Sequence, residues 1–285
     1  MANPLLLPPT EHLRHMLVRR IQSVFNDRDR GEEPVVRSDN ALYPRQSVIW
    51  RVHGDVTTMM IGGVTALLLQ MLHPAALAGV WDHSGFRGDM LGRLRRTARF
   101  IAVTTFGDRA DANAAIDRVC QVHERVKGVL PDGTPYAATD PRLLAWVHVC
   151  EAMGFLNAWM AFAEPGMSRA DQDRYFKQAA QIARALGADP VPESRAEAEA
   201  LMTSFLPELK ADARTRDVAR MILSQPAPST AMRPAQSMLM QASVDILPPW
   251  AKWLHGFPAR PLASPLVRGS AFIVAHTVRW AFNHS

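Results

Sequence analysis

The chain has 285 residues, of which 48% are hydrophobic and 21% charged, and this balance excludes a disordered, collagen-like or coiled-coil protein. The formal net charge is +5, from 32 basic and 27 acidic residues, but the basic residues form no stripe or readout motif, which disfavours a nucleic-acid binder. Two cysteines, Cys120 and Cys150, are too few for a disulfide framework, so we expect a reducing compartment, by default the cytoplasm.

Helix signals dominate the whole chain. Cap residues repeatedly precede runs with apolar residues at helical spacing, whereas the alternation typical of strands is scarce, and this predicts an all-α protein. An amphipathic helix is expected from Glu11 to Phe25, followed by a charged, irregular segment from Asn26 to Pro44. We therefore expect residues 1–45 to pack on a single all-α domain formed by residues 46–285.

An uncharged stretch runs from Val56 to Trp81. Its length would permit a membrane span, but it contains several threonines, glycines and a proline, and no second span follows. We therefore predict no transmembrane span, but a helix that is buried on all sides, begins at the cap residue Asp55 and ends near the pair His73-Pro74.

Two helices are expected next. The first is capped by Asp89 and ended by Gly107, and the second runs from Asp111 to Lys127 and is ended by Gly128. A turn-rich segment follows. The remaining helices are predicted from Asp140 to Ala163, from Ser168 to Gly187, from Ser194 onward, from Asp212 to Ser224, from Pro234 to Ile246 and from about Ser264 to Phe282.

Several common catalytic motifs are missing from the sequence. It has no glycine-rich phosphate loop, no nucleophile elbow and no His-Glu-x-x-His motif. The pairs Cys120/His123 and His148/Cys150 suggest zinc, but residues two apart on a helix point about 200° away from each other, so His148 and Cys150 cannot both reach one ion. Zinc is therefore disfavoured.

His123 lies in the apolar stripe of the helix predicted from Asp111. A buried imidazole needs a partner for each nitrogen, because an unsatisfied group costs about 1–3 kcal/mol. A metal on one nitrogen and a hydrogen bond on the other would supply both partners. From the residues alone, a core histidine satisfied by hydrogen bonds remains the alternative.

The helix predicted between Asp89 and Gly107 carries polar residues beside its apolar stripe. Arg93, Thr97 and Phe100 lie on its flank at helical spacing, with Arg96 nearby. An arginine at the edge of a buried face suits an anionic group at the mouth of an apolar pocket, as in haem, whose two propionates arginine can pair. The alternative is that Arg93 only extends to the surface and shields the core.

The helix that follows Asp140 is hydrophobic on nearly every side, yet it carries His148 and Glu151 three residues apart on one face. The two side chains could bond to each other and support a cofactor or relay a proton. A buried structural pair is the equal alternative.

Several short segments follow one another along the chain: Leu72–Val80, Asp82–Ser84, Arg93–Thr97, Phe106–Gly107, Val122–Gly128, Tyr136–Pro141 and Trp146–His148. As an ordered set they resemble the motifs of the oxygenase MpaB family, which includes the bacterial rubber oxygenases. The resemblance covers roughly residues 52–162 and, more weakly, 247–250.

The resemblance implies a globin-like helical core that holds haem b, with His123 as the proximal ligand of the iron. It places Arg93, Arg96 and Thr97 on the distal side of the haem. His148 is a further candidate for cofactor binding, on the strength of its position beside Glu151 on a mostly apolar helix. The implied chemistry is O₂-dependent cleavage of a carbon–carbon double bond in an isoprenoid chain.

The sequence departs from the rubber-cleaving pattern at two places. Arg96 stands where those enzymes have a lysine that can ligate iron, and Leu77 stands where they have a distal glutamate. The next carboxylate is Asp82, which with His73 and His83 is a candidate for proton handling.

A haem oxygenase or a peroxidase for a smaller hydrophobic substrate is compatible with these departures. We expect a haem b-dependent oxygenase that uses O₂, with an isoprenoid as a candidate substrate and Arg93, Thr97 and Asp82 in catalysis. A non-catalytic haem-binding or haem-sensing protein is the first alternative. A haem-free helical structural protein is the second.

Overall fold

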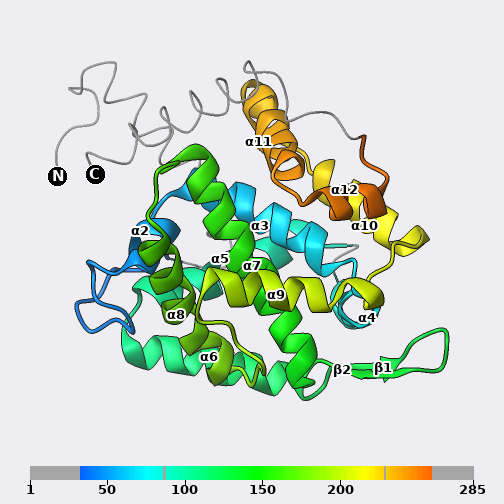
Figure 1. Ribbon diagram of the computed structural model, residues 1–285, viewed down its shortest axis with the longest axis horizontal. Coiled ribbons are helices and arrows are strands. Elements are labelled where there is room, and N and C mark those ends of the chain that lie inside the picture. The colour runs from blue at the N-terminus through cyan, green and yellow to red at the C-terminus, as the bar shows by residue number, and fades with distance from the viewer. Residues whose placement is uncertain (1–32, 86–87, 228, 259–285) are drawn as a thin grey trace.

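The computed structural model describes residues 33–85, 88–227 and 229–258, and in these ranges the chain is mostly helical (Figure 1). The prediction of an all-α protein is confirmed, with one two-stranded hairpin as the only sheet in the described ranges. The helices expected at 11–25 and 264–282 lie outside the described residues. The division at residue 45 and the globin-like core stay predictions.

The elements follow one another with short connections. In chain order they are α2 (Val48–His53), α3 (Val56–Gln70), α4 (Pro74–His83), α5 (Met90–Phe106), α6 (Arg109–His123), β1 (Lys127–Val129), β2 (Pro135–Ala137), α7 (Pro141–Phe162), α8 (Arg169–Ala185), α9 (Arg195–Ser204), the short 3₁₀ helix η4 (Leu206–Glu208), α10 (Ala213–Leu223), the 3₁₀ helix η5 (Thr230–Met232), α11 (Arg233–Asp245) and α12 (Pro249–His255).

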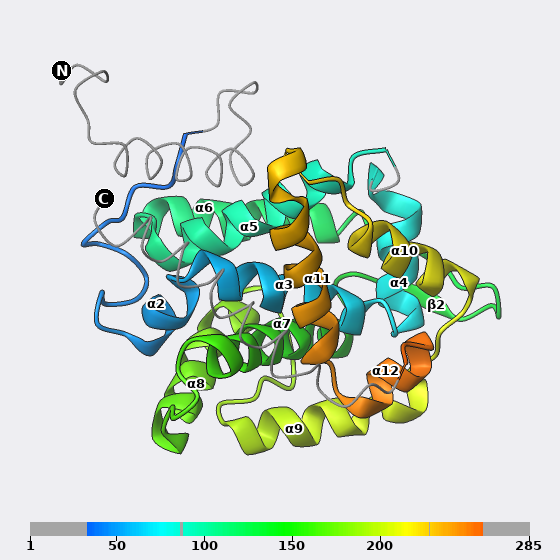
Figure 2. The same cartoon turned by 90° about the horizontal axis from the view of Figure 1, so that it is seen from above.

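The centre of the molecule is the contact between α3 and α7, which lie side by side in both views (Figures 1 and 2). Glycines allow the close approach of the two backbones. A Cβ atom on Gly62 would come 2.7 Å from the Cα of Phe155, and one on Gly154 would come 2.6 Å from the carbonyl oxygen of Gly62. Real Cβ atoms do not approach backbone so closely, so this crossing requires glycine at both positions.

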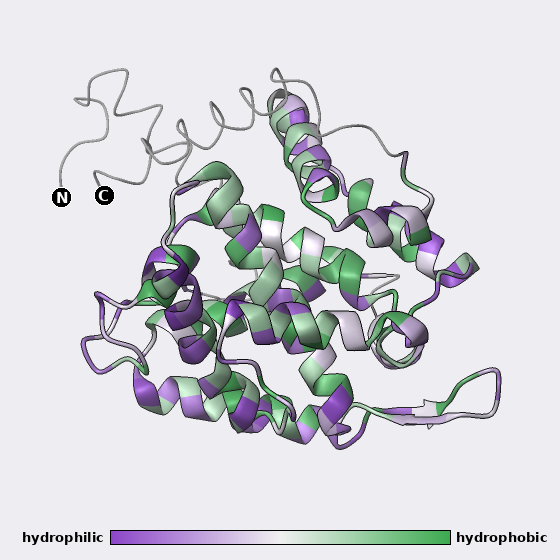
Figure 3. Ribbon diagram, in the orientation of Figure 1, coloured by the Kyte–Doolittle hydropathy of each residue, from purple (hydrophilic) through white to green (hydrophobic). Residues whose placement is uncertain are grey.

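α7 is buried on nearly every side, as its sequence predicts. It is long and apolar enough to cross a membrane by composition, but 61% of its most apolar window is buried inside the protein. Figure 3 shows α3 and α7 as largely hydrophobic, whereas α6 and α8 carry hydrophilic stretches. A helix surrounded by other helices is apolar all round because every face packs against the core.

The uncharged stretch forms two helices rather than one. α3 ends at Gln70, close to the predicted end, and α4 then leaves at an angle of 105°. His73 is the N-cap of α4, since its Nδ1 accepts a hydrogen bond from the backbone N–H of Ala75 at 3.2 Å. α4 was not predicted, and neither were the short helices α2 and α12.

Most predicted helix starts are confirmed, because a side-chain cap is a local interaction. The side chain of each of the following residues accepts a hydrogen bond from a backbone N–H in the first turn of its helix: Asp55, Asp89, Asp140, Ser168, Ser194 and Asp212. The predicted stops near Gly107 and Gly187 are also confirmed, and Gly187 has a positive φ of 90°.

The prediction of a helix from Asp111 to Lys127 is wrong at both ends. α6 begins earlier, because Asp108 caps it, and it ends at His123. Lys127 instead opens strand β1, which pairs antiparallel with β2. Gly128 does not stop a helix: it lies against the ring of Tyr136, whose hydroxyl oxygen would be 2.7 Å from an added Cβ.

Candidate functional site

The connection between α5 and α6 sets the position of the candidate residues. Only Gly107 and Asp108 separate the two helices, which pack against each other. Arg93 lies fourteen residues before Gly107, and His123 lies fifteen residues after Asp108. At 1.5 Å per residue both positions are about 21–22 Å along their helices from this connection, so they lie at the same end of the helix pair.

His123 is the last residue of α6 and is half-buried. Its Nδ1 is buried and has no hydrogen-bond partner among the described residues. Burial lowers the pKa of its imidazole below the usual value of 6.5, so the ring is neutral at pH 7. A neutral imidazole that the surrounding chain leaves unsatisfied is a suitable ligand for a metal ion.

Arg93 turns into the protein rather than toward solvent. Its Nη1 donates a hydrogen bond to the hydroxyl of Ser84 at 2.8 Å, and that hydroxyl donates to the carbonyl oxygen of Val80 at 2.6 Å. Burial is the main reason why the pKa of the guanidinium is lowered, and the nearby charge of Arg96 adds to it. An arginine remains charged even so, and α5 therefore brings a fixed cation to the interior.

A second polar cluster joins α3 and α7. Nε2 of Gln70 lies 3.2 Å from the carbonyl oxygen of Val147 and 3.4 Å from Oε1 of Glu151, and donates to both. Burial raises the pKa of Glu151 to about 7, while the hydrogen bond from Gln70 and the charge of Arg93 act in the opposite direction. At neutral pH this carboxyl group is therefore present in both protonation states.

His148 does not support Glu151 as the sequence suggested. Its Nε2 is buried and has no partner in the part of the chain that the structure describes, and Glu151 accepts a hydrogen bond from Gln70 instead. Burial lowers the pKa of His148 to about 4, and the charge of Arg184 adds to this effect. His148 is therefore a second neutral imidazole with a buried nitrogen that lacks a partner among the described residues.

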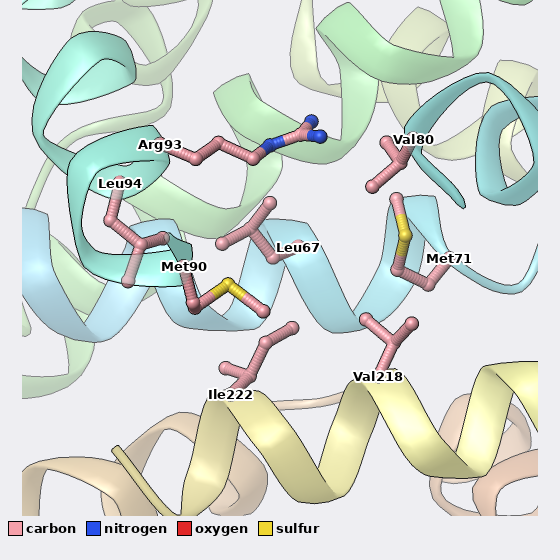
Figure 4. Close-up of a pocket in the computed structure, with 8 residues that line it drawn as sticks. All are labelled: Leu67, Met71, Val80, Met90, Arg93, Leu94, Val218 and Ile222. Carbon is pink, nitrogen blue, oxygen red and sulfur yellow. The ribbon is translucent and has the colours of Figure 1, made fainter. Parts of the chain in front are cut away.

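Beside Arg93 lies a small apolar pocket between α3, α4, α5 and α10 (Figure 4). Its cavity of about 10 Å³ is close to the space that one water molecule requires. Arg93 is the one charged side chain in the lining, and its guanidinium lies above the apolar side chains in Figure 4. The lining consists of Leu67, Met71, Val80, Met90, Arg93, Leu94, Val218 and Ile222.

The remaining predicted residues lie farther out. Thr97 is half-buried on α5, one turn after Arg93, whereas Arg96 is exposed and pairs with Asp89 at 3.5 Å. Asp82 is exposed and accepts a hydrogen bond from the hydroxyl of Tyr136 at 3.0 Å. Asp82 is thus directed to the hairpin, although Ser84, two residues on, contacts Arg93.

The two other candidates for proton handling already have partners. The ring of His83 lies with its Nε2 3.2 Å from the hydroxyl of Tyr136. His73 caps α4, and its Nε2 lies 3.5 Å from Oε2 of Glu208. Both imidazoles are held in place by contacts that the fold itself explains.

Sequence reasoning missed Gln70 as part of the site. In the sequence, Gln70 is one polar residue within the uncharged stretch from Val56 to Trp81. An amide in the middle of a buried helix requires hydrogen-bond partners, and that requirement is the signal that could have identified it. The partner, Glu151, is 81 residues away, so no local pattern connects the two.

The residues present fit an iron porphyrin. Such a group needs an axial nitrogen ligand for iron, cations or hydrogen-bond donors for its propionates, and apolar surroundings. The unsatisfied imidazole of His123, the inward-facing Arg93 and the partly buried apolar side chains of α5 supply these features. In residues 33–85, 88–227 and 229–258, no three His, Cys, Asp or Glu side chains gather as a protein-only metal site.

Comparison with known proteins gives one family match. Residues 50–280 match the family model described as "ER-bound oxygenase mpaB/B'/Rubber oxygenase, catalytic domain". No curated protein and no solved structure shows a significant match to the chain. The match includes every site residue named above and extends well beyond the segment 52–162 that carries the resemblance in the sequence.

Proposed function

The chain belongs to the family of ER-bound oxygenase mpaB/B' and rubber oxygenase catalytic domains, and we propose that it is a haem b-dependent oxygenase for a hydrophobic substrate. The family supports an oxygenase and hence O₂ and a substrate. Haem, the identity of the substrate and a cytoplasmic location are the proposal. The observation that supports haem most directly is the buried, unsatisfied Nδ1 of His123 at the same end of the helix pair as Arg93.

His123 would hold the iron, and the half-buried side of α5 would face the same cofactor. Bound haem supplies the chemistry that this chain's side chains lack, namely the binding and activation of O₂. The neutral state of His123 matters, because a protonated imidazole cannot ligate a metal. Its lowered pKa keeps the ring ready for ligation across the neutral range.

Arg93 and Thr97 would stabilise the oxygen atoms that acquire negative charge during the reaction. Arg93 is held by Ser84, so its positive charge is oriented before the substrate arrives. A preorganised cation stabilises negative charge that develops on an oxygen atom and requires no rearrangement to do so. Thr97, one turn further along α5, can add a hydroxyl hydrogen bond, and His148 supplies a neutral imidazole from α7.

The substrate would be hydrophobic and small, with an unsaturated isoprenoid as the main candidate. The cavity next to Arg93 is only about as large as one water molecule, so it is the apolar character of its lining, apart from the arginine itself, that supports a hydrophobic substrate. Apolar walls exclude water and orient a hydrocarbon without hydrogen bonds. The family includes rubber oxygenases, and an isoprenoid substrate is the proposal that follows from this for the present chain.

Two measurements on one preparation test the proposal. Purified protein is titrated with hemin while the Soret band and the iron content are recorded. Stoichiometric binding with a sharp Soret band is expected, and its absence would favour a haem-free structural protein. Consumption of O₂ with a short unsaturated isoprenoid, together with carbonyl products, then separates an oxygenase from a protein that only binds or senses haem.

A further inference from the structure

Ser84 ends helix α4, and its hydroxyl lies between two neighbouring helices. The backbone N–H and the hydroxyl of Ser84 both donate to the carbonyl oxygen of Val80, at 3.2 and 2.6 Å. A serine hydroxyl has a single proton, so after this bond only the lone pairs of its oxygen remain for other partners. Ser84 is therefore available as an acceptor for a donor from another element.

The donor that Ser84 accepts is Arg93 of α5, whose Nη1 lies 2.8 Å from the hydroxyl oxygen. Val80 and Arg93 come from different helices, and both line the small apolar pocket. Ser84 thus joins two residues of the lining, and Figure 4 shows the side chain of Arg93 extended toward Val80. A hydroxyl that already donates one hydrogen bond accepts the next more strongly, because hydrogen-bonded groups polarise one another.

A capping role for Ser84 does not by itself explain the direction of Arg93. Serine hydroxyls commonly bond to the carbonyl oxygen four residues earlier, and the bond to Val80 needs no arginine. A half-buried arginine normally extends its guanidinium to water, where the charge is solvated. Arg93 instead gives a donor to Ser84, so this contact determines where the guanidinium lies.

Tyr136 of strand β2 anchors the end of α4 that carries Ser84. Its hydroxyl donates to Oδ2 of Asp82 at 3.0 Å and lies 3.2 Å from Nε2 of His83. Because the phenol proton goes to Asp82, the ring nitrogen of His83 is the donor in the second contact. The two residues before Ser84 are therefore tied to one buried side chain, which keeps this helix end from fraying.

We propose that Ser84 is a positioning residue: it fixes the guanidinium of Arg93 at the edge of the pocket, and Tyr136 holds the helix end that carries it. With Ser84 in place, the charge of Arg93 is oriented before O₂ or a substrate binds, so no later rearrangement is required. The effect on turnover rests on the proposed oxygenase function, whereas the contact between Ser84 and Arg93 does not.

The first experiment measures the accessibility of Arg93 in the protein without added haem. The protein is treated with phenylglyoxal, which modifies accessible guanidinium groups, and the rate at Arg93 is read by mass spectrometry of its peptides. Ser84→Ala should raise this rate about fivefold, the ratio that corresponds to the loss of a net hydrogen bond of about 1 kcal/mol. Ser84→Thr retains the hydroxyl and should keep the wild-type rate.

A matched control is Ser204→Ala, which removes a hydroxyl bonded to the carbonyl oxygen of Leu201 at the end of α9. It should leave the rate at Arg93 unchanged. Tyr136→Phe keeps the ring but loses the hydroxyl, so it should raise the rate at Arg93 by less than Ser84→Ala does. If Ser84→Ala does not fold, Ser84→Cys replaces it, because a thiol is similar in size but only a weak acceptor.

Three outcomes of this experiment would overturn the proposal. An unchanged rate at Arg93 in Ser84→Ala or its substitute Ser84→Cys, or a rate in Ser84→Thr as high as in Ser84→Ala, would show that the hydroxyl does not hold the guanidinium. An unchanged rate in Tyr136→Phe would show that the hairpin does not anchor the helix end.

The second experiment compares turnover per bound haem in a double-mutant cycle of the haem-loaded protein. Ser84→Ala should lower kcat for O₂ consumption about tenfold, as expected for the loss of a hydrogen bond to a charged group. It should have no further effect when Arg93 is already alanine, because Ser84 acts through Arg93. A loss by the same factor in both backgrounds would overturn the proposal. If no preparation consumes O₂, the oxygenase function fails, and the rates of arginine modification still decide the role of Ser84.

Discussion

The α3/α7 crossing and the α5/α6 pair are built in opposite ways. At the crossing, two glycines bring backbones into contact, and most residues of α7 are buried. In α5, no residue from 93 to 103 is fully buried, and the pair leaves an imidazole nitrogen of His123 unsatisfied. The first region is closely packed, although Nε2 of His148 on α7 has no partner among the described residues, whereas the second leaves its apolar side chains only partly covered around the unsatisfied Nδ1 of His123. Buried polar groups without a partner cost stability. Such groups are typical of sites that bind something.

The largest expected effect concerns the α5/α6 pair. His123→Ala should abolish stable haem binding, because it removes the proposed iron ligand, and should leave the helical signal in circular dichroism nearly unchanged. The Soret band and the iron content after hemin addition measure the first effect. His83→Ala, an exposed histidine on α4, is the matched control and should bind haem normally.

A normal Soret band in His123→Ala would show that the proximal assignment is wrong. His148 or His73 would then be the next ligand to test. His148 is the stronger of the two, since it also has a buried nitrogen without a partner.

The crossing is tested by a pair of adjacent glycines in α3. Gly62→Ala should destabilise the protein by about 3 kcal/mol, because its Cβ would come 2.7 Å from backbone atoms of α7 that cannot move away easily. Gly63→Ala is the control: its Cβ would meet only Phe155 at 3.6 Å, an ordinary contact. Since alanine favours helix over glycine by about 1 kcal/mol, Gly63→Ala should be neutral or stabilising.

Urea-induced unfolding measures both glycine variants. Equal stabilities of the two proteins would mean that the crossing does not depend on the missing side chain at position 62.

The next largest effect is expected from substitutions of Arg93. Arg93→Ala should leave haem bound and reduce turnover by about 10²-fold, the typical loss for one preorganised donor to a developing charge. Arg93→Lys should restore activity only in part, because an ammonium group lacks the planar fork of a guanidinium. Haem affinity and kcat are measured on the same samples.

The two quantities together decide the role of Arg93. Loosened haem with normal turnover per bound haem would indicate that it pairs a propionate instead. A variant that is normal in both would remove Arg93 from the site.

The buried histidines predict how stability depends on pH. His148, with a pKa of about 4, and His53, with a pKa of about 3, are neutral in the folded protein and take up protons near pH 6.5 when it unfolds. Their contribution to the free energy of unfolding is therefore complete above pH 6.5 and is lost as the pH falls toward 4 and below. The loss amounts to about 1.4 kcal/mol per histidine and pH unit.

Glu151 changes the stability of the folded protein with pH in the opposite direction. Its pKa is raised to about 7, so it favours the folded state below pH 4.5 and loses that contribution as the pH rises through 7. Unfolding free energies from pH 4 to 8 should therefore show a maximum between these limits. The rise between pH 4 and 6.5 should be smaller in His148→Gln, and an unchanged rise would show that His148 is not buried in its neutral form.

The smallest effect tests a local element at the start of α5. Asp89→Ala removes the N-cap acceptor of the N–H of Gly92 and should cost about 1 kcal/mol. Because Arg93 follows directly after this turn, a small decrease in turnover should accompany the lower stability. Asp89→Asn is the control, since asparagine is an equally good cap.

The start of helix α6 was predicted wrongly, for a reason that the structure explains. Asp111 has the composition of a cap, but Asp108 directly follows Gly107 and captures the N–H of Ala110 first. The acidic residue at 111 then lies in the first turn, where the helix dipole also favours it. The local sequence is compatible with a helix that is capped by either Asp108 or Asp111. The short connection between α5 and α6 decides in favour of Asp108.

What the sequence determined by itself is local or periodic. Side-chain caps act over two or three residues, so the starts of α3, α5, α7, α8, α9 and α10 could be predicted. The apolar stripe of α6 and the all-round apolar composition of α7 likewise identified His123 and the central helix. The family could be identified from an ordered set of short motifs, because their order does not depend on contacts.

What only the tertiary structure decided depends on contacts between residues distant in the sequence. The turn from α6 into β1 follows from the packing of Gly128 against Tyr136. The partner of Glu151 is Gln70 rather than His148, because the α3/α7 crossing brings an amide close to the carboxyl group. A buried polar group takes whichever donor the packing of helices places within about 3.5 Å, and that choice is not written in the spacing of either helix.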